Sequence, residues 1–119
     1  CPPGKAVITS GGNLKAEYVI HTVGPVWNGG DENEPKVLKS AYYNSLKLAL
    51  KNKIKSISFP SISTGAYGYP TEKAAEVALF TINKFAQNND FPQQIKMILY
   101  SEQDFKTYLN VWEKCIINN

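Results

Sequence analysis

Alternating strand and helix patterns predict that this 119-residue chain folds as one α/β domain, with helices packed on a sheet. Two observations carry this prediction. Short segments rich in β-branched and aromatic residues recur along the chain, and the last three are each followed by apolar residues at helical spacing. The length is enough to bury one core, so residues 1–119 are interpreted as a single domain.

Four segments are predicted to be strands because they combine β-branched and aromatic residues. The first is closed by the turn 10–13, and the second stops at Gly24-Pro25. The four predicted strands are residues 6–9, 18–23, 54–59 and 95–100.

Three helices are predicted between and after these strands. Pro35 suits the first turn of a helix that runs to about Lys51, and a second helix covers residues 72–88. Ser101 with Asp104 resembles a capping box that opens the third. The residues expected to be buried are Val37, Leu38, Ala41, Tyr42, Leu46, Ala49 and Leu50 in the first helix, Ala74, Ala75, Ala78, Leu79, Ile82 and Phe85 in the second, and Phe105, Tyr108, Leu109 and Trp112 in the third.

Residues 56–71 form the most informative stretch: a strand, a loop with two glycines around an aromatic residue, and the start of a helix. Such a loop directs backbone N–H groups outward, and this geometry binds phosphate. Gly65 and Gly68 allow positive φ and close approach of a ligand, and Tyr67 offers a flat face for stacking. The pattern is neither a P-loop nor a dinucleotide fingerprint. On spacing alone, an ordinary turning loop and a phosphate-binding loop remain equally open.

All 13 basic residues are lysine, and the net charge is +3. Bidentate guanidinium binding of phosphate is therefore excluded, and backbone N–H groups with a helix dipole would have to hold it. Lys47, Lys51, Lys53 and Lys55 crowd the end of the first helix. Without interleaved aromatic residues, they indicate a solvated face more than a nucleic-acid patch.

Two cysteines and one histidine make neither a disulfide framework nor a zinc site, so we expect no metal and no cofactor. A reducing, cytoplasmic location is the simplest interpretation. No apolar run approaches the ~20 residues of a membrane span, so no membrane contact is expected. Because the chain starts at Cys1 without Met, we interpret it as a processed or excised piece.

Four single residues have a structural and a functional interpretation. His21 lies mid-strand and is interpreted as a packed, hydrogen-bonded residue and not as a base. Cys1 as an N-terminal nucleophile is disfavoured, since Pro2-Pro3 follows it. Trp27 indicates a partly exposed hydrophobic anchor, and Cys115 a small buried residue.

Several segments, taken in order, resemble the macro domain family, and its MacroD-type branch in particular. The matching segments are residues 1–6, 8–14, 18–25, 40–42 and 59–70. Members of this branch bind ADP-ribose and often remove it from acidic side chains. The resemblance implies a three-layer α/β/α fold with a mixed sheet. It also implies mono-ADP-ribosyl-protein hydrolase or O-acetyl-ADP-ribose deacetylase activity, with ADP-ribose or an ADP-ribosylated protein as the partner.

The resemblance assigns the ligand site residue by residue. Ser63 to Gly68 match the family's loop around the diphosphate, and Tyr67 matches the aromatic beside the proximal ribose. Tyr100 and Ser101 match positions near the adenine and its ribose. The implied ligand-binding residues are Pro60, Ser63, Thr64, Gly65, Ala66, Tyr67, Gly68, Tyr100 and Ser101, with no catalytic residue assigned.

The family's early strands, first ligand loop and catalytic Asp precede the equivalent of Cys1, and the chain contains no match to them. We therefore expect about four strands with exposed sheet edges, filled by a dimer or a complementing segment. We also expect ADP-ribose binding to exceed catalysis. Two alternatives stay open: a non-catalytic ADP-ribose reader, and a nucleic-acid or poly-ADP-ribose binder that uses the lysine cluster.

Overall fold

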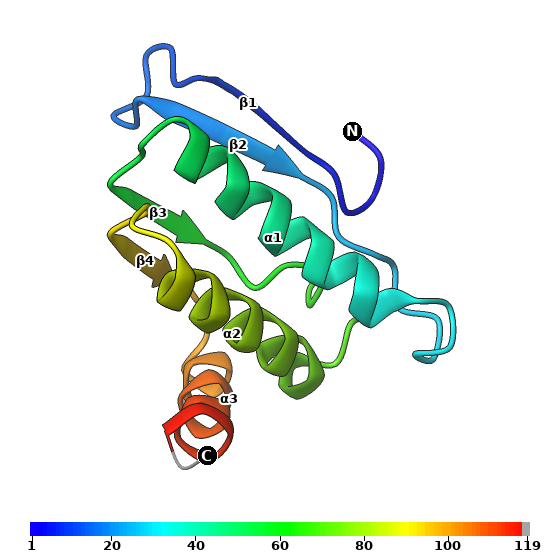
Figure 1. Ribbon diagram of the computed structural model, residues 1–119. Helices are drawn as coiled ribbons and strands as arrows, with labels where there is room; N and C mark the ends of the chain where they lie inside the picture. Colours follow the sequence, from blue (N-terminus) through cyan, green and yellow to red (C-terminus); the bar gives the residue numbers. More distant parts are fainter. Residues whose placement is uncertain (118–119) are drawn as a thin grey trace.

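The computed structural model describes residues 1–117, in which an antiparallel strand pair is followed by helices that alternate with two further strands (Figure 1). This alternation confirms the predicted α/β class. The elements are β1 (Ala6–Ser10), β2 (Tyr18–Thr22), α1 (Glu34–Lys51), β3 (Ser56–Phe59), α2 (Thr71–Asn88), β4 (Gln94–Met97), α3 (Glu102–Val111) and a π-helical turn, η1 (Trp112–Ile117).

The four strands form two separate pairs. β1 and β2 run antiparallel, with Ala6 opposite Thr22, and β3 and β4 run parallel, with Phe59 opposite Met97. Both pairing directions are therefore present, as expected for a mixed sheet. The expected single four-stranded sheet is not formed, because within residues 1–117 no ladder joins β2 to β3.

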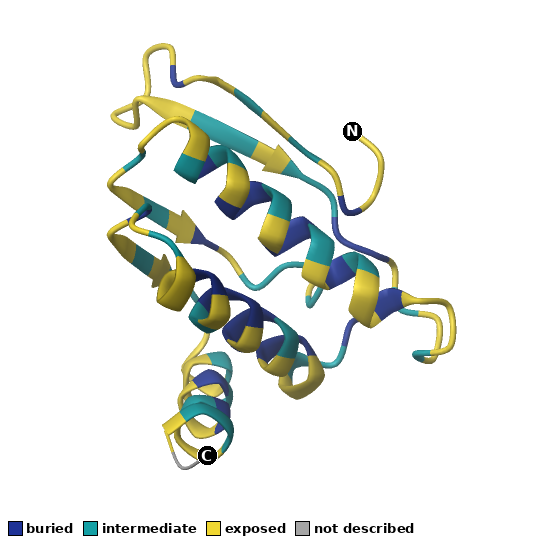
Figure 2. Ribbon diagram, viewed as in Figure 1, coloured by how far each residue is buried: buried dark blue, intermediate teal, exposed yellow. Residues whose placement is uncertain are grey.

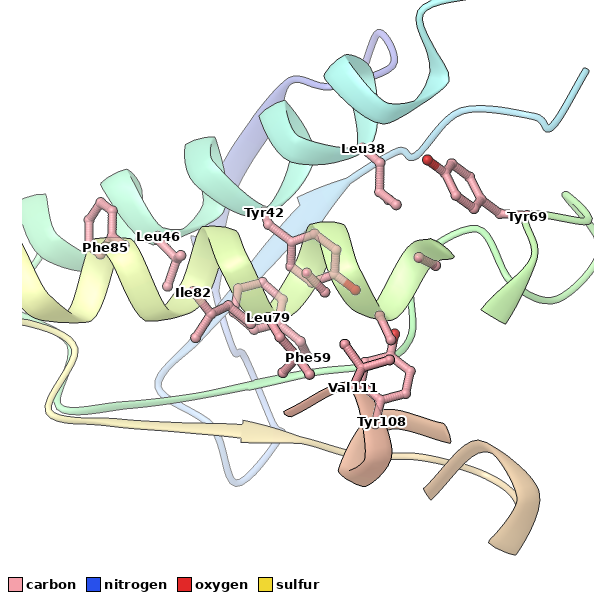
Figure 3. Close-up of a cluster of buried hydrophobic side chains, with 13 residues drawn as sticks. Leu38, Tyr42, Leu46, Phe59, Tyr69, Leu79, Ile82, Phe85, Tyr108 and Val111 are labelled. Atoms are coloured by element: carbon pink, nitrogen blue, oxygen red, sulfur yellow. The ribbon is translucent and has the colours of Figure 1, made fainter. Parts of the chain in front are cut away.

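The core lies between the helices and the strands. α1 packs against α2 and against both strands of the β1–β2 pair, and the buried residues of α1 and α2 face inward (Figure 2). Figure 3 shows Tyr42 and Phe59 side by side in this core, with ring centroids 5.1 Å apart. Every residue predicted to be buried in α1 and α2 is buried except Val37 and Leu50, which are half-buried.

The third helix differs from its prediction. Tyr108 is buried, but Phe105 and Leu109 are 57% and 45% exposed, because α3 packs mainly along α2 and offers it one narrow stripe. Trp112 is half-buried and begins η1. The strand predicted to reach Tyr100 ends at Met97, so Tyr100 lies beyond it.

No helix within residues 1–117 is both long enough and apolar enough to span a bilayer.

Candidate ligand-binding site

The loop between β3 and α2, residues 60–70 and called the ligand loop below, folds back on itself in two tight turns. The Gly68 N–H donates to the Gly65 carbonyl at 3.0 Å, and the Tyr69 N–H donates to the Ser63 carbonyl at 2.9 Å. Tyr67 at the tip is 40% exposed, whereas Tyr69 is buried in the core. The loop therefore presents one tyrosine to solvent and anchors itself with the other.

Five consecutive backbone N–H groups in this loop, those of residues 63–67, donate to no partner within the described part of the chain. The first turn of α2 follows directly, and its N–H groups have no intrahelical acceptor either, since the first helical bond is from Ala74 to Pro70. A curved run of unpaired donors beside a helix N-terminus is the geometry that holds an anion.

Two residues of the ligand loop adopt the left-handed backbone conformation. They are Ser63, with φ 70°, and Gly68, with φ 72°. Gly68 thus uses the positive φ that glycine allows, Gly65 does not, and the second left-handed residue of the loop is Ser63. At both glycines an added Cβ would meet no atom within 4 Å. Gly65 therefore leaves the surface of the loop open, as a ligand approaching the backbone requires.

Tyrosines from two helices hold the beginning of the ligand loop. The Tyr42 hydroxyl of α1 donates to the Pro60 carbonyl at 3.2 Å and accepts from the Ile62 N–H at 3.1 Å. The Tyr108 hydroxyl of α3 lies 2.5 Å from Ser61 Oγ. Both rings point to this region in Figure 3. The loop therefore starts from a fixed, core-bonded base.

Burial keeps both of these tyrosines neutral. Loss of solvent raises the pKa of Tyr42 well above its ordinary value of 10, and burial likewise raises the pKa of Tyr108. A neutral hydroxyl can both donate and accept. The pair therefore keeps this role across the whole physiological pH range.

A second loop, which leaves β2, supports the tip of the ligand loop. The Trp27 N–H donates to the Tyr67 carbonyl at 2.9 Å, and the rings of Trp27 and Tyr69 are 4.7 Å apart. An added Cβ at Gly24 would lie 2.1 Å from Ser63 Oγ. Trp27 is half-buried against the core, as the anchor interpretation predicted. The two loops therefore pack as one unit.

Glu34 organises this second loop, and the sequence analysis missed it. The residue is 1% exposed, and its carboxylate accepts hydrogen bonds from the backbone N–H groups of Asn28, Gly30 and Glu32 at 2.6–2.9 Å. Burial by itself would raise the pKa of Glu34, but the N–H donors outweigh it and lower the pKa to about 2. The sequence feature that could have indicated this role is the position of Glu34, an acidic residue just before Pro35 at the start of a helix.

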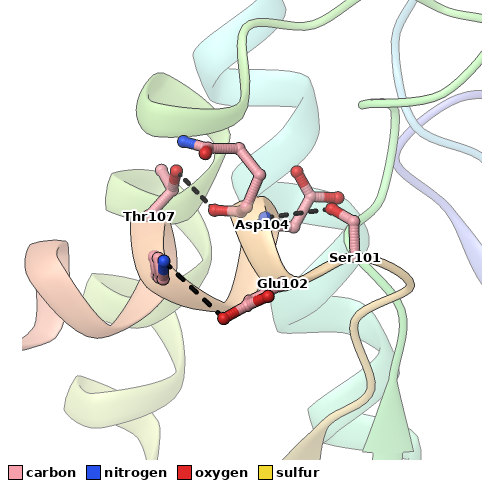
Figure 4. A network of polar contacts seen from close by, with 6 residues as sticks. Ser101, Glu102, Asp104 and Thr107 are labelled. Atoms are coloured by element: carbon pink, nitrogen blue, oxygen red, sulfur yellow. Dashed lines mark hydrogen bonds and ion pairs between the residues drawn. The ribbon is translucent and has the colours of Figure 1, made fainter.

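Tyr100 and Ser101 leave the same edge of the parallel β3–β4 pair as the ligand loop. The Ile98 N–H donates to the Phe59 carbonyl at 2.8 Å, which fixes the two strand ends side by side. Ser101 Oγ accepts the Asp104 N–H at 3.0 Å and caps α3, which confirms the N-cap half of the predicted capping box (Figure 4). Tyr100 is 96% exposed. Within residues 1–117, no hydrogen bond joins these two residues to the tip of the ligand loop.

The remaining sequence candidates do not join this site. His21 is exposed and its Nε2 lies 3.0 Å from Thr9 Oγ1, so it is hydrogen-bonded as expected but is not packed inside. Cys1 is exposed at the chain start, and Cys115 is half-buried in η1. The four clustered lysines are exposed. Within residues 1–117 no group of three or more His, Cys, Asp or Glu is placed to hold a metal.

Comparison with known proteins identifies the class to which this fold and site belong. The model of the macro domain family matches residues 1–78. The chain therefore belongs to the macro domain family.

Individual relatives support the same family assignment. The chain is 49% identical over 114 residues to a macro domain-containing protein of Caldanaerobacter subterraneus, covering 96% of this chain and 65% of the relative. It is 53% identical over 108 residues to an O-acetyl-ADP-ribose deacetylase of Citrobacter koseri, covering 91% and 61%.

Two solved macrodomains superpose on the chain. The Oceanobacillus iheyensis macrodomain with ADP has a TM-score of 0.93 and 44% identity, covering 99% of this chain and 62% of that one. The Trypanosoma brucei macrodomain in complex with ADP-ribose has a TM-score of 0.84 and 38% identity, covering 92% and 46%. The chain thus spans less than two thirds of the length of these proteins.

Proposed function

We propose that this chain binds ADP-ribose, with the diphosphate on the backbone of Ser63 to Gly68 and Tyr67 against the proximal ribose. Tyr100 and Ser101 are assigned to the adenosine end, because they leave the same sheet edge as the ligand loop. The related solved structures with ADP and with ADP-ribose support this ligand class. Pro60 belongs to the site as its base, through its bond to Tyr42.

One observation carries the proposal: the five N–H groups of residues 63–67 are unpaired, in a loop where an added Cβ at Gly65 would meet no atom within 4 Å. A diphosphate needs several donors converging on a small volume, and a chain without arginine must supply them from its backbone.

We propose that the whole protein carries out the family's reaction. That reaction removes ADP-ribose from a modified protein, or the acetyl group from O-acetyl-ADP-ribose. The deacetylase relatives support this reaction. In these 119 residues we expect binding to exceed turnover, because backbone donors and a stacking ring hold substrate and transition state about equally. In the described part of the chain no carboxylate or imidazole side chain is hydrogen-bonded to residues 60–68.

Isothermal titration with ADP-ribose tests the binding proposal. We expect one site, with weaker binding of ADP and still weaker binding of AMP, which has only one phosphate. Affinity for ADP-ribose should change little with salt, whereas binding through the exposed lysines should fall steeply as salt rises. Binding that is lost at high salt and is strongest for RNA or poly-ADP-ribose would favour the lysine cluster instead.

Turnover is tested with O-acetyl-ADP-ribose and with a peptide mono-ADP-ribosylated on glutamate. We expect this chain to be slower than the Citrobacter koseri deacetylase by about 10²–10⁴-fold, the usual cost of losing general-base help. Equal rates would contradict the expectation and would place the reacting groups among these residues. Cytoplasmic location remains part of the proposal, because two cysteines cannot form a disulfide framework.

A further inference from the structure

The outward side of α1 has an uneven composition. Exposed positions recur along the whole helix, where Figure 2 colours them yellow. They are Pro35, Lys36, Lys39, Tyr43, Lys47 and Lys51. Beyond the proline at its start, every exposed residue of α1 is therefore a lysine or a tyrosine, whereas the solvated face of a helix usually mixes acidic with basic residues.

No carboxylate neutralises this side of the helix. Aspartate and glutamate are absent from residues 35–71, and the first acidic residue of the chain is Glu17. In the part of the chain that the structure describes, the only ion pair lies within α3. Lys47 and Lys51 are four residues apart, a spacing at which like charges on a helix repel each other. The surface therefore keeps an uncompensated positive charge.

The helix dipole accounts for part of this charge only. Lys51 in the last turn is stabilised by the negative end of the dipole. Lys36 lies in the first turn, where a positive charge is unfavourable. Lysines at both ends of the helix therefore indicate an interaction with an anion outside the chain.

A groove of about 460 Å³ runs beside these lysines, between α1 and the beginning of β1. Its charged lining residues are Lys5, Lys47 and Lys51, with no acidic residue among them. The Asn44 side-chain amide donates to the Gly4 carbonyl at 2.7 Å, which fixes the segment before β1 against α1. Lysines from two distant parts of the sequence thus line one hollow.

Tyr43 places an aromatic ring among the lysines. The residue is 44% exposed, and Lys47 Nζ lies 5.7 Å from the centroid of its ring. The ring also packs edge-on against the buried Phe85 of α2, with centroids 5.9 Å apart. The sequence analysis disfavoured nucleic acid because it found no aromatic residue interleaved with the lysines. Tyr43 is such a residue.

We propose that single-stranded nucleic acid binds along α1 and the adjoining groove, with phosphates on the lysines and a base on the Tyr43 ring. This surface is called the lysine face and consists of Lys5, Lys36, Lys39, Tyr43, Lys47 and Lys51. Proteins that bind single strands combine a positively charged groove with aromatic rings on which bases stack. A duplex has no unpaired base to offer the ring. A bilayer is disfavoured too, because no exposed aliphatic side chain other than Pro35 lies on α1.

The lysine face is separate from the ligand loop. Tyr42 points into the core and bonds to the base of that loop, whereas its neighbour Tyr43 is on the outside of the same helix. Nucleic acid and ADP-ribose should therefore bind at the same time. The proposal does not depend on the proposed function.

The test measures fluorescence anisotropy of a labelled oligo(U) of about 12 nucleotides mixed with the 119-residue chain. Uracil is used because it keeps the probe distinct from the adenosine end of ADP-ribose. We expect a 1:1 complex whose affinity falls as salt rises, with a logarithmic slope of about −0.7 for each phosphate bound.

Two double variants locate the site. Lys47→Gln with Lys51→Gln should weaken oligo(U) binding about tenfold or more and make the salt slope shallower by about 1. Lys106→Gln with Lys114→Gln removes the same charge from exposed positions on α3 and η1, and should change neither quantity. Equal losses in the two double variants would overturn the proposal.

Tyr43 separates base stacking from charge. Tyr43→Leu keeps an apolar contact for Phe85 but lacks a flat ring, so oligo(U) should bind about 5–150-fold more weakly. Tyr43→Phe should bind like the unchanged chain. The melting temperature of each variant shows that it is folded, and the lysine variants still decide the proposal if Tyr43→Leu does not fold.

Four further results would overturn the proposal. They are no oligo(U) binding at low salt, equal binding of a duplex, displacement of oligo(U) by saturating ADP-ribose, and displacement by phosphatidylserine vesicles at equal lipid charge. Binding of oligo(U) by a chain that does not bind ADP-ribose would support the lysine face and refute the proposed function.

Discussion

The ligand loop and the outer edges of β2 and β3 both expose unpaired backbone groups, but in different arrangements. In the ligand loop, five successive unpaired N–H groups lie on a tight turn. This set contains donors only, without the carbonyl acceptors that alternate with donors along a strand edge. Along β2 and β3, donors and acceptors alternate at every second residue on a nearly straight edge. The curved set suits a compact anion, whereas the straight set suits a polypeptide.

The difference shows that the geometry of unpaired groups carries more information than their number. Exposed N–H and C=O groups without a protein partner are hydrogen-bonded to water, which a ligand or another chain can replace. The shape of the set then indicates the partner. Four predictions test the ligand-loop side of this comparison.

The largest effect is expected at Gly65. Gly65→Val places a branched side chain on the open face where a diphosphate would approach, although the unbound fold has room for it. Loss of two charge-assisted hydrogen bonds, about 1.5–3 kcal/mol each, should reduce ADP-ribose affinity by about 10²–10⁴-fold. The melting temperature should stay nearly unchanged.

Gly12→Ala is the control for this change. Gly12 lies in the turn between β1 and β2 and also has no atom within 4 Å of an added Cβ, but its φ is +58°. That substitution should lower stability and leave the affinity for ADP-ribose intact. Normal ADP-ribose affinity in Gly65→Val would contradict the assignment of the ligand loop.

Next in size is Tyr67→Ala. Loss of a stacked ring should weaken ADP-ribose binding by about 1–3 kcal/mol, by analogy with base–aromatic stacking. Tyr67→Phe should retain most of the affinity, because the flat face remains. Tyr18 is a matched control, since it is 42% exposed and lies on β2. An equal loss for Tyr18→Ala in calorimetry would show that the effect is not local.

A smaller effect is expected for Tyr42→Phe. The change removes the hydroxyl that pairs with the Pro60 carbonyl and the Ile62 N–H, and leaving these groups unpaired should cost about 1–3 kcal/mol of stability. Hydrogen exchange at Ile62 should accelerate more than exchange in α1. Tyr43→Phe, at an exposed ring on the same helix, should change neither quantity.

The smallest effect at neutral pH concerns Glu34. Its pKa is lowered from 4.5 to about 2 in the folded chain, so its contribution to stability is complete above pH 4.5 and is lost as the pH falls toward 2. Thermal denaturation should show the melting temperature falling across this window. Glu34→Gln should flatten that dependence, whereas Glu32→Gln, at an exposed carboxylate, should not. An unchanged pH profile in Glu34→Gln would refute the role.

The sequence predicted the helices, the strands and the ligand loop better than it predicted which residues contact one another. Side-chain periodicity reports local conformation, which is why all four strands and α1 to α3 were found, and why the cap at Ser101 was correct. Burial in α3 was wrong at Phe105 and Leu109, because an apolar stripe does not say how much surface its neighbour covers.

Long-range contacts explain the other differences. Glu34 is buried because three N–H groups of an adjacent loop converge on it, and no periodicity encodes that. The positive φ at Ser63 arises where the second loop packs against it. The split into two strand pairs likewise depends on which strands meet, which single-strand patterns cannot specify.

The contact between Gly24 and Ser63 has a consequence for protein engineering. Any side chain at position 24 would collide with Ser63 Oγ and Ile62, so a loop grafted over residues 60–70 from another macrodomain has to pack just as closely against Gly24. A graft that alters ligand preference must carry residues 24–27 along with them, including the Trp27 bond to the Tyr67 carbonyl. The smallest transplantable recognition unit in this chain is therefore a pair of segments more than 30 residues apart in sequence.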